Sequence, residues 1–136
     1  MENDSVFWDD AYSVGFEPID NQHKALVKMT NELFENCKKG TADADAAFLQ
    51  TIKRAVDYAR NHFSDEVNYM VQVDYPNLTE HRKLHDDFFA VVLKAMQEFE
   101  SGKTAPVELA RFLKNWLLTH IANSDKQYAP YLKKFL

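Results

Sequence analysis

The chain has 136 residues, of which 46% are hydrophobic and 27% are charged, and its formal net charge at pH 7 is −5. This length suffices for one domain with its own core, while the negative charge argues against nucleic acid as a partner, because phosphate binding needs a concentrated basic face. No apolar run approaches the roughly 20 residues that cross a bilayer, and the first residues lack the basic region of a signal peptide. Together with a single cysteine, Cys37, these features predict one domain, residues 1–136, that is soluble and cytoplasmic.

The first 19 residues mix glycine, proline, aspartate and aromatic residues without the spacing of a helix. We expect them to form an ordered N-terminal arm, because its aromatic side chains gain from burial against the rest of the chain. The residues expected to pack in this way are Phe7, Trp8, Tyr12 and Phe16.

The remaining chain favours a few long helices over many short strands, because the whole sequence holds only 3 glycines and 4 prolines. Asp20 is the predicted N-cap of a first helix that ends near Lys39, with Gly40 directly after it. A second helix is predicted from about residues 43–44 to about residues 70–71.

The stretch DYPN at 74–77 is predicted to be a turn, since proline disfavours helix at the residue before it. Asn77 and Glu80 resemble a capping box that opens a third helix, which should end near residues 101–102. Thr104 should cap a fourth helix with Pro106 in its first turn, and Pro130 should limit how far the last helix continues.

Apolar side chains recur at alternating spacings of three and four along each segment, which turns one face of each helix inward. Short connections make neighbouring helices antiparallel, so the predicted fold is all-α, an up-down-up-down antiparallel four-helix bundle at 20–136 with the arm at 1–19. All five histidines of the chain fall on the inward stripes: His23, His62, His81, His85 and His120.

Two pairs of side chains lie four residues apart, and each pair therefore shares one helix face. These pairs are His62 with Glu66, and His81 with His85. His120 and Asp125 are five residues apart, which at about 100° per residue puts Asp125 roughly 140° round a regular helix. We therefore predict an irregularity between residues 120 and 125, such as a π-helical turn, that returns Asp125 to the face of His120.

A single histidine on an apolar helix face is more often a hydrogen-bonded core residue than a metal ligand. Here five histidines and two carboxylates, Glu66 and Asp125, share inward faces, and buried polar groups on this scale need a partner. Seven ligands are too many for one tetrahedral zinc and imply two metal ions. Imidazole with bridging carboxylates favours iron, and the lack of any Glu-x-x-His disfavours the oxidase and ferritin types of diiron site.

The order and spacing of these residues resemble the hemerythrin family, in particular its bacterial members, the bacteriohemerythrins. The pattern consists of His23, H-x-x-x-E at 62–66, H-x-x-x-H at 81–85 and H-x-x-x-x-D at 120–125. The stretches IDNQHKAL at 19–26 and DYPNLTEHRKLH at 74–85 strengthen the resemblance, which covers nearly the whole chain.

The resemblance implies two iron ions that are bridged by Glu66, Asp125 and an oxo or hydroxo group. One iron would take His81, His85 and His120, and the other would take His23 and His62. An apolar oxygen pocket is also implied, whose walls exclude water and slow oxidation; otherwise its residues are ordinary core. The implied pocket residues are Leu26, Phe63, Trp116 and Ile121.

The function that the resemblance implies is reversible binding of dioxygen, for carriage, storage or delivery, with no catalytic residue. An enzyme that turns over peroxide or nitric oxide at the same irons is one alternative, although ligation of all five histidines leaves no evident acid or base. An oxygen or redox sensor is another alternative. A sensor would need a separate partner, which nothing in the sequence indicates, or the chain would be a domain cut from a longer protein.

Overall fold

The computed structural model describes residues 6–37, 42–103 and 106–135, and this part of the chain is helical and has no β-strand. The all-α class predicted from the sequence is therefore confirmed. In chain order the elements are a 3-10 turn η1 (Asp10–Tyr12), α1 (Glu17–Cys37), α2 (Ala42–Gln72), α3 (Leu78–Glu100), α4 (Pro106–Thr119), a π-helix η2 (His120–Asp125) and α5 (Lys126–Phe135).

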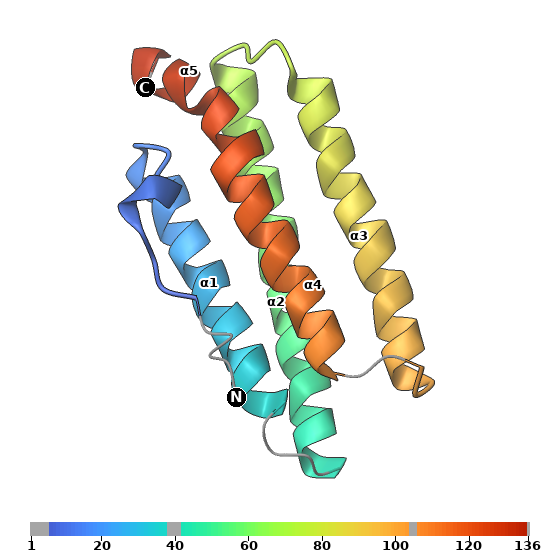
Figure 1. Ribbon diagram of the computed structural model, residues 1–136. Coiled ribbons are helices and arrows are strands. Elements are labelled where there is room, and N and C mark those ends of the chain that lie inside the picture. Colours follow the sequence, from blue (N-terminus) through green and yellow to red (C-terminus); the bar gives the residue numbers. More distant parts are fainter. Residues whose placement is uncertain (1–5, 38–41, 104–105, 136) are drawn as a thin grey trace.

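The helices α1 to α4 run alternately in opposite directions and form a bundle (Figure 1). Helix α1 contacts α2 and α4, and α3 contacts the same two helices, so the four surround one core. The apolar stripes meet inside this core, where Phe48, Val92 and Leu109 are almost completely buried. Elements η2 and α5 continue the chain directly after α4, and both the start of α1 and the end of α2 lie at this end of the bundle (Figure 1).

Helix α1 begins at Glu17, three residues before the predicted N-cap Asp20. Pro18 explains the difference, because proline fits the first turn of a helix, where its missing N–H is not needed. The Asp20 carboxylate instead fastens the arm: it accepts hydrogen bonds from the Ser13 hydroxyl at 2.5 Å and from the Val14 N–H at 2.8 Å. The predicted end near Lys39 and Gly40 lies outside the described residues.

Residues 6–16 of the arm pack against the bundle, as expected, but not through every predicted aromatic residue. Trp8, Tyr12 and Phe16 pack against buried clusters. The expectation for Phe7 is wrong, because its side chain is 75% exposed. Val6 takes the inward position, since the Asn31 side chain bonds both its N–H, at 2.7 Å, and its carbonyl, at 2.8 Å, and so fixes which neighbour points outward.

Two further local expectations are corrected. Asn77 precedes α3 but makes no side-chain capping hydrogen bond, so the predicted capping box does not form. Pro130 lies inside α5, which continues to Phe135. Pro130 is exposed, so water can reach the Lys126 carbonyl that a proline cannot bond. Thr104, the predicted cap of α4, lies outside the described residues.

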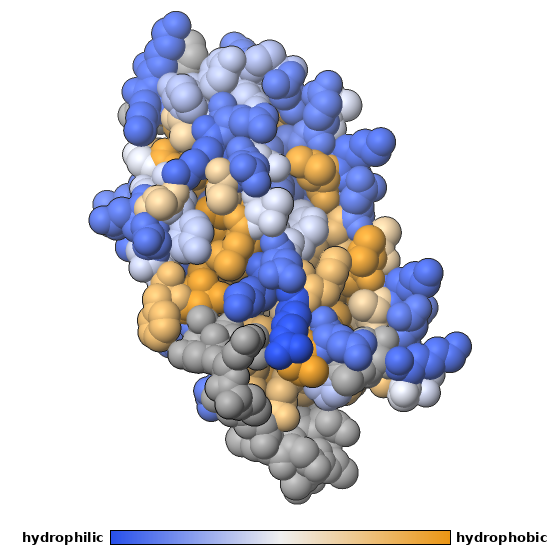
Figure 2. Space-filling model, in the orientation of Figure 1, coloured by the Kyte–Doolittle hydropathy of each residue, from blue (hydrophilic) through white to orange (hydrophobic). Residues whose placement is uncertain are grey.

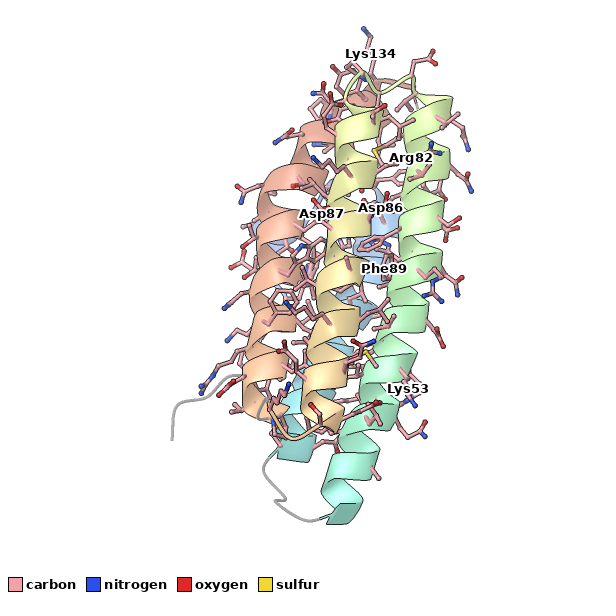
Figure 3. All side chains as sticks on the ribbon, turned by 90° about the vertical axis from the view of Figure 1, so that its right-hand side faces the viewer. Lys53, Arg82, Asp86, Asp87, Phe89 and Lys134 are labelled. Atoms are coloured by element: carbon pink, nitrogen blue, oxygen red, sulfur yellow. The ribbon has the colours of Figure 1, made fainter. Side chains whose placement is uncertain are left out.

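On the face drawn in Figure 2, polar side chains surround hydrophobic patches that lie along the middle of the bundle. On the outer side of α3, Asp86 and Asp87 are exposed (Figure 3). Phe89 lies between α3 and α2, where the centroid of its ring is 5.5 Å from the Arg60 guanidinium. None of the helices in the described ranges is both long and apolar enough to cross a membrane.

Candidate metal centre

The seven side chains singled out in the sequence meet inside the bundle, although they come from four separate elements. Helix α1 carries one of them, α2 and α3 carry two each, and η2 carries the last two. Each is less than 5% exposed: His23, His62, Glu66, His81, His85, His120 and Asp125.

The irregularity predicted between residues 120 and 125 is confirmed. His120–Asp125 forms a π-helix between the α-helices α4 and α5. In a π-helix the hydrogen bonds join residues five apart, so His120 and Asp125 come to the same side. The Asp125 carboxylate is completely buried, and its Oδ1 atom lies 2.9 Å from His120 Nε2.

The potential ligand atoms form two adjoining groups, in each of which all atoms lie within 4.8 Å of one another. One group consists of His23, His62, Glu66 and Asp125, and the other of Glu66, His81, His85 and His120. This division of the histidines is the one that the resemblance implies. Whether these atoms bind metal stays a prediction.

Both carboxylates reach across the boundary between the two groups. Asp125 places Oδ2 at 2.9 Å from His23 Nε2, and it places Oδ1 at 3.2 Å from His81 Nε2. Glu66 places Oε1 at 2.5 Å from His62 Nε2 and Oε2 at 3.6 Å from His81 Nε2. Each carboxylate therefore directs one oxygen toward each group.

Six buried polar atoms of this cluster have no hydrogen-bond partner: both ring nitrogens of His23, Glu66 Oε1, His81 Nε2 and both oxygens of Asp125. Several of them lie near an oppositely charged atom, such as His23 Nε2 and Asp125 Oδ2 at 2.9 Å, yet they are not aligned for a hydrogen bond. Orphaned buried polar groups are costly, and they are rare in native proteins. Atoms that converge without bonding one another fit a site whose cations lie between them.

The donor set is also charged in a way that suits cations. Burial alone would raise the pKa of Asp125, but the charge of His120 and the contacts with His120, His23 and His81 hold that pKa well below its usual range. Burial would likewise raise the pKa of Glu66, as would the nearby charge of Asp125, yet His62 and His81 lower it. Both carboxylates are therefore ionised at neutral pH.

Two histidines one turn apart on α3 differ in protonation. Burial lowers the pKa of His85 to about 3, with further lowering by the neighbouring His120 and His81. Burial also disfavours the charged form of His81, but Asp125 and Glu66 outweigh that effect and raise its pKa to about 9. The carboxylates thus favour a cation at His81, while His85 presents a neutral imidazole, the form that binds metals.

Aromatic rings hold two of the histidines in place. The Phe63 ring stacks on His85 with centroids 3.8 Å apart and planes 4° from parallel. Trp116 stacks on His120 with centroids 4.5 Å apart and planes at 13°. These contacts restrict the rotation of both imidazoles.

An apolar cavity of about 40 Å³ adjoins these rings. It is large enough for a molecule of two or three atoms, because one water needs roughly 10–15 Å³. Three of the four implied pocket residues line it, namely Leu26, Phe63 and Trp116. Ile121 is fully buried but is not among the lining residues.

The family model described as "Hemerythrin HHE cation binding domain" matches residues 14–132 of this chain. The chain belongs to the hemerythrin family.

Its curated relatives include hemerythrins of bacteria and of animals. A bacteriohemerythrin of Stenotrophomonas maltophilia is 32% identical over 131 residues, which cover 96% of this chain and 84% of the relative. A bacteriohemerythrin of Pseudomonas aeruginosa is 35% identical over 128 residues, or 94% of this chain and 82% of the relative. A myohemerythrin of Riftia pachyptila is 32% identical over 121 residues, or 89% of this chain and 88% of the relative.

Solved structures agree with this assignment. A crystal structure of wild-type hemerythrin superposes with a TM-score of 0.83 at 26% identity, and covers 93% of this chain and 97% of that chain. A leucine-to-alanine mutant of hemerythrin gives a TM-score of 0.84 at the same identity, and covers 93% of this chain and 96% of that chain. The chain is thus an all-α hemerythrin bundle whose histidine and carboxylate cluster is compatible with a diiron site.

The neighbours of the hemerythrin cluster could be named only in part from the sequence. Tyr128, whose proximity in sequence makes it a candidate, donates a hydrogen bond from its hydroxyl to Glu66 Oε2 at 2.8 Å. Sequence reasoning missed Gln22, whose Oε1 lies 2.5 Å from His62 Nδ1. Its place directly before His23 in IDNQHKAL was the available signal, but nothing in one sequence shows that α1 and α2 bring it to His62.

Proposed function

We propose that this chain binds dioxygen reversibly at a pair of iron ions, for carriage, storage or delivery. The observation that carries the proposal is the cluster of six buried polar atoms that converge without hydrogen bonds in two groups that share Glu66. A bound, reduced iron pair would supply electrons to dioxygen when it binds and would take them back when it is released. The names of the bacteriohemerythrin and myohemerythrin relatives support the choice of family chemistry.

The residues expected to hold the ions follow from the two groups. His81, His85 and His120 would hold one iron, and His23 and His62 would hold the other. Glu66 and Asp125 would bridge the ions together with an oxo or hydroxo group, because each carboxylate directs one oxygen toward each group. Nitrogen and oxygen donors of this kind suit iron.

The apolar cavity supports a carrier rather than an enzyme. Its walls are hydrocarbon and aromatic surface from α1, α2, α3 and α4. Thr30 bears the one hydroxyl among its lining residues, and this hydroxyl donates a hydrogen bond to the Leu26 carbonyl at 2.9 Å. A site lined almost entirely by apolar surface supplies few protons, and where water is excluded, side reactions at a reactive centre are suppressed.

Anaerobic reconstitution with ferrous iron tests the function. We expect two irons per chain, uptake of one dioxygen per iron pair on exposure to air, and recovery of the reduced protein under vacuum. Irreversible oxidation with rapid consumption of added peroxide would instead support the enzyme. A chain that retains no iron would overturn the proposal altogether. The Glu66→Ala variant is the matched control, because it removes the carboxylate shared by both groups and should abolish uptake.

A further inference from the structure

Gln22 connects a buried histidine of the cluster to a carboxylate on the surface. Its side-chain oxygen, Oε1, lies 2.5 Å from Nδ1 of His62, and its side-chain nitrogen, Nε2, donates to Oδ2 of Asp65 at 2.8 Å. His62 is 2% exposed, whereas Asp65 lies on the exposed side of α2, one turn further along. The three side chains thus form one chain of hydrogen bonds from solvent to the cluster.

The chemistry of these groups fixes the direction of every hydrogen bond. An ionised carboxylate can only accept, so Asp65 requires the amide nitrogen of Gln22 on its side. The Gln22 oxygen must then face His62, and an oxygen can only accept, so Nδ1 of His62 must carry the proton. A neutral imidazole with its proton on Nδ1 has its lone pair on Nε2, which is the nitrogen that points to Glu66 at 2.5 Å.

We propose that Gln22 and Asp65 are positioning residues that fix the protonated nitrogen of His62 and so direct its free lone pair toward a metal ion. The inference rests on the proposed function, because it assumes that His62 binds metal. Hydrogen bonds to the outer nitrogen of a ligating histidine orient the ring and select its tautomer. The group that contains His62 has only two histidines, so a misdirected lone pair removes half of its imidazole donors.

Isosteric exchanges test the direction of this relay, by which we mean the hydrogen-bonded chain from Asp65 through Gln22 to His62. In Asp65→Asn, residue 65 can donate as well as accept, so the Gln22 amide is free to turn and to offer its NH2 group to Nδ1 of His62. In the double variant Asp65→Asn with Gln22→Glu, residue 22 can only accept, which requires the proton on Nδ1 again. The double variant also keeps the net charge of the native pair. Asp57→Asn is the matched control, because Asp57 is an exposed carboxylate on the same helix whose ion pair is with Arg60.

Zinc is the probe, since it accepts imidazole ligands and has no redox chemistry. Nitrogen-detected NMR of the zinc-loaded protein reports which nitrogen of His62 carries the proton, and transfer of zinc to a chelator reports how firmly the metal is held. We expect the Nδ1–H signal in the native chain and its loss in Asp65→Asn, with zinc release faster by about 10-fold, the lower end for lost histidine partners. The double variant should restore both readouts.

The outcomes separate the relay from the metal site itself. A native chain that binds zinc, with the same His62 signal and release rate in Asp65→Asn, would overturn the relay but leave the proposed function intact. Equal effects of Asp57→Asn and Asp65→Asn would also overturn it, because the cause would then be surface charge. A native chain that binds neither zinc nor iron would overturn both proposals. Oxygen uptake does not enter any of these measurements.

Discussion

Leu26 and Ile121 each lie within three residues of a candidate ligand, His23 and His120, yet only one of them faces the apolar cavity. Both are almost fully buried beside the cluster, at 6% and 0% exposure. Leu26 lines the apolar cavity and Ile121 does not. A polar group at Leu26 therefore enters the cavity, while one at Ile121 is placed in packed core, where it destabilises the fold.

Leu26→Asn is expected to shorten the lifetime of the oxygenated protein several-fold, because an amide in the cavity attracts water, which supplies protons. The lifetime is followed by visible absorption after air is added to the reduced, iron-loaded protein. Leu33→Asn is the matched control, because Leu33 lines the same cavity but lies seven residues, or about 10 Å, further along α1. An equal effect of both variants would show that general loss of packing, and not proximity to the centre, sets the lifetime.

The seven candidate ligands could be proposed from the sequence because they recur at helical spacing on inward faces. The sequence could not decide which residues form hydrogen bonds with them, since the partner of each ligand is distant from it in sequence. Tyr128 lies 62 residues from Glu66, and Gln22 lies 40 residues from His62. Tyr69 lies three residues after Glu66, as Tyr128 lies three residues after Asp125, so both are candidate partners by sequence. Tyr69 packs edge-on against Phe16 instead, with ring centroids 4.9 Å apart. Only the packing of α1, α2 and α5 decides among such residues.

At the level of elements, the π-helix η2 gives the chain one residue more than a regular helix would need between His120 and Asp125. The cost is a local loss of regular α-helical hydrogen bonds. The benefit is that α4, η2 and α5 pass the cluster with two candidate ligands on the same side, and that α5 then buries Tyr128 and Leu132 almost completely.

Insertion of one alanine after Ala122, an exposed residue of η2, would place Asp125 six residues after His120, one more than the π-helix accommodates. Helix α5 would then turn by about 100° relative to α4, which removes Tyr128 and Leu132 from their buried cluster. We expect a loss of more than about 3 kcal/mol in the free energy of unfolding, as for large-to-small core changes, and less than two irons per chain.

Urea unfolding and iron analysis measure the two effects of this insertion. Ala122→Ser, which changes the residue but keeps the length, should leave both near native values. Native iron content in the insertion variant would mean that the spacing of five residues between His120 and Asp125 is not needed to place Asp125.

The helices themselves follow from apolar periodicity, and their order could be predicted from the short connections. Their ends could not be predicted as well, because they depend on contacts outside the helix. Asp20 is of a residue type that often caps helices, but its side chain accepts hydrogen bonds from Ser13 and Val14 of the arm. Asn77 is also of such a type, yet its side chain makes no capping hydrogen bond to α3.

At the level of the whole molecule, the buried histidines link stability to pH. In the metal-free protein His81 has a pKa raised to about 9 from the ordinary 6.5, so its contribution is complete below 6.5 and is lost as the pH rises toward 9. His85 has a pKa lowered to about 3, so it stays neutral in the fold, and stability falls as the pH drops below 6.5 and the unfolded chain takes up the proton.

We therefore expect the metal-free protein to be most stable near pH 6.5, with the free energy of unfolding falling on each side by up to about 1.4 kcal/mol per pH unit for each histidine. Urea titrations between pH 4.5 and 9.5 measure this profile. His85→Gln should flatten the acid side above pH 4.5, where Glu66, with its lowered pKa, does not yet contribute. An acid side that is unchanged in His85→Gln would contradict the assignment.

The six unpartnered polar atoms at the centre of the bundle also bear on how long the chain survives in a cell. Until metal arrives, these atoms remain buried without hydrogen bonds, which lowers the stability of the fold, and a newly made chain unfolds more often. Proteases act on such open chains, so a modest change in stability alters abundance several-fold. Under the proposed function, iron starvation would thus clear the protein after synthesis, without any change in transcription.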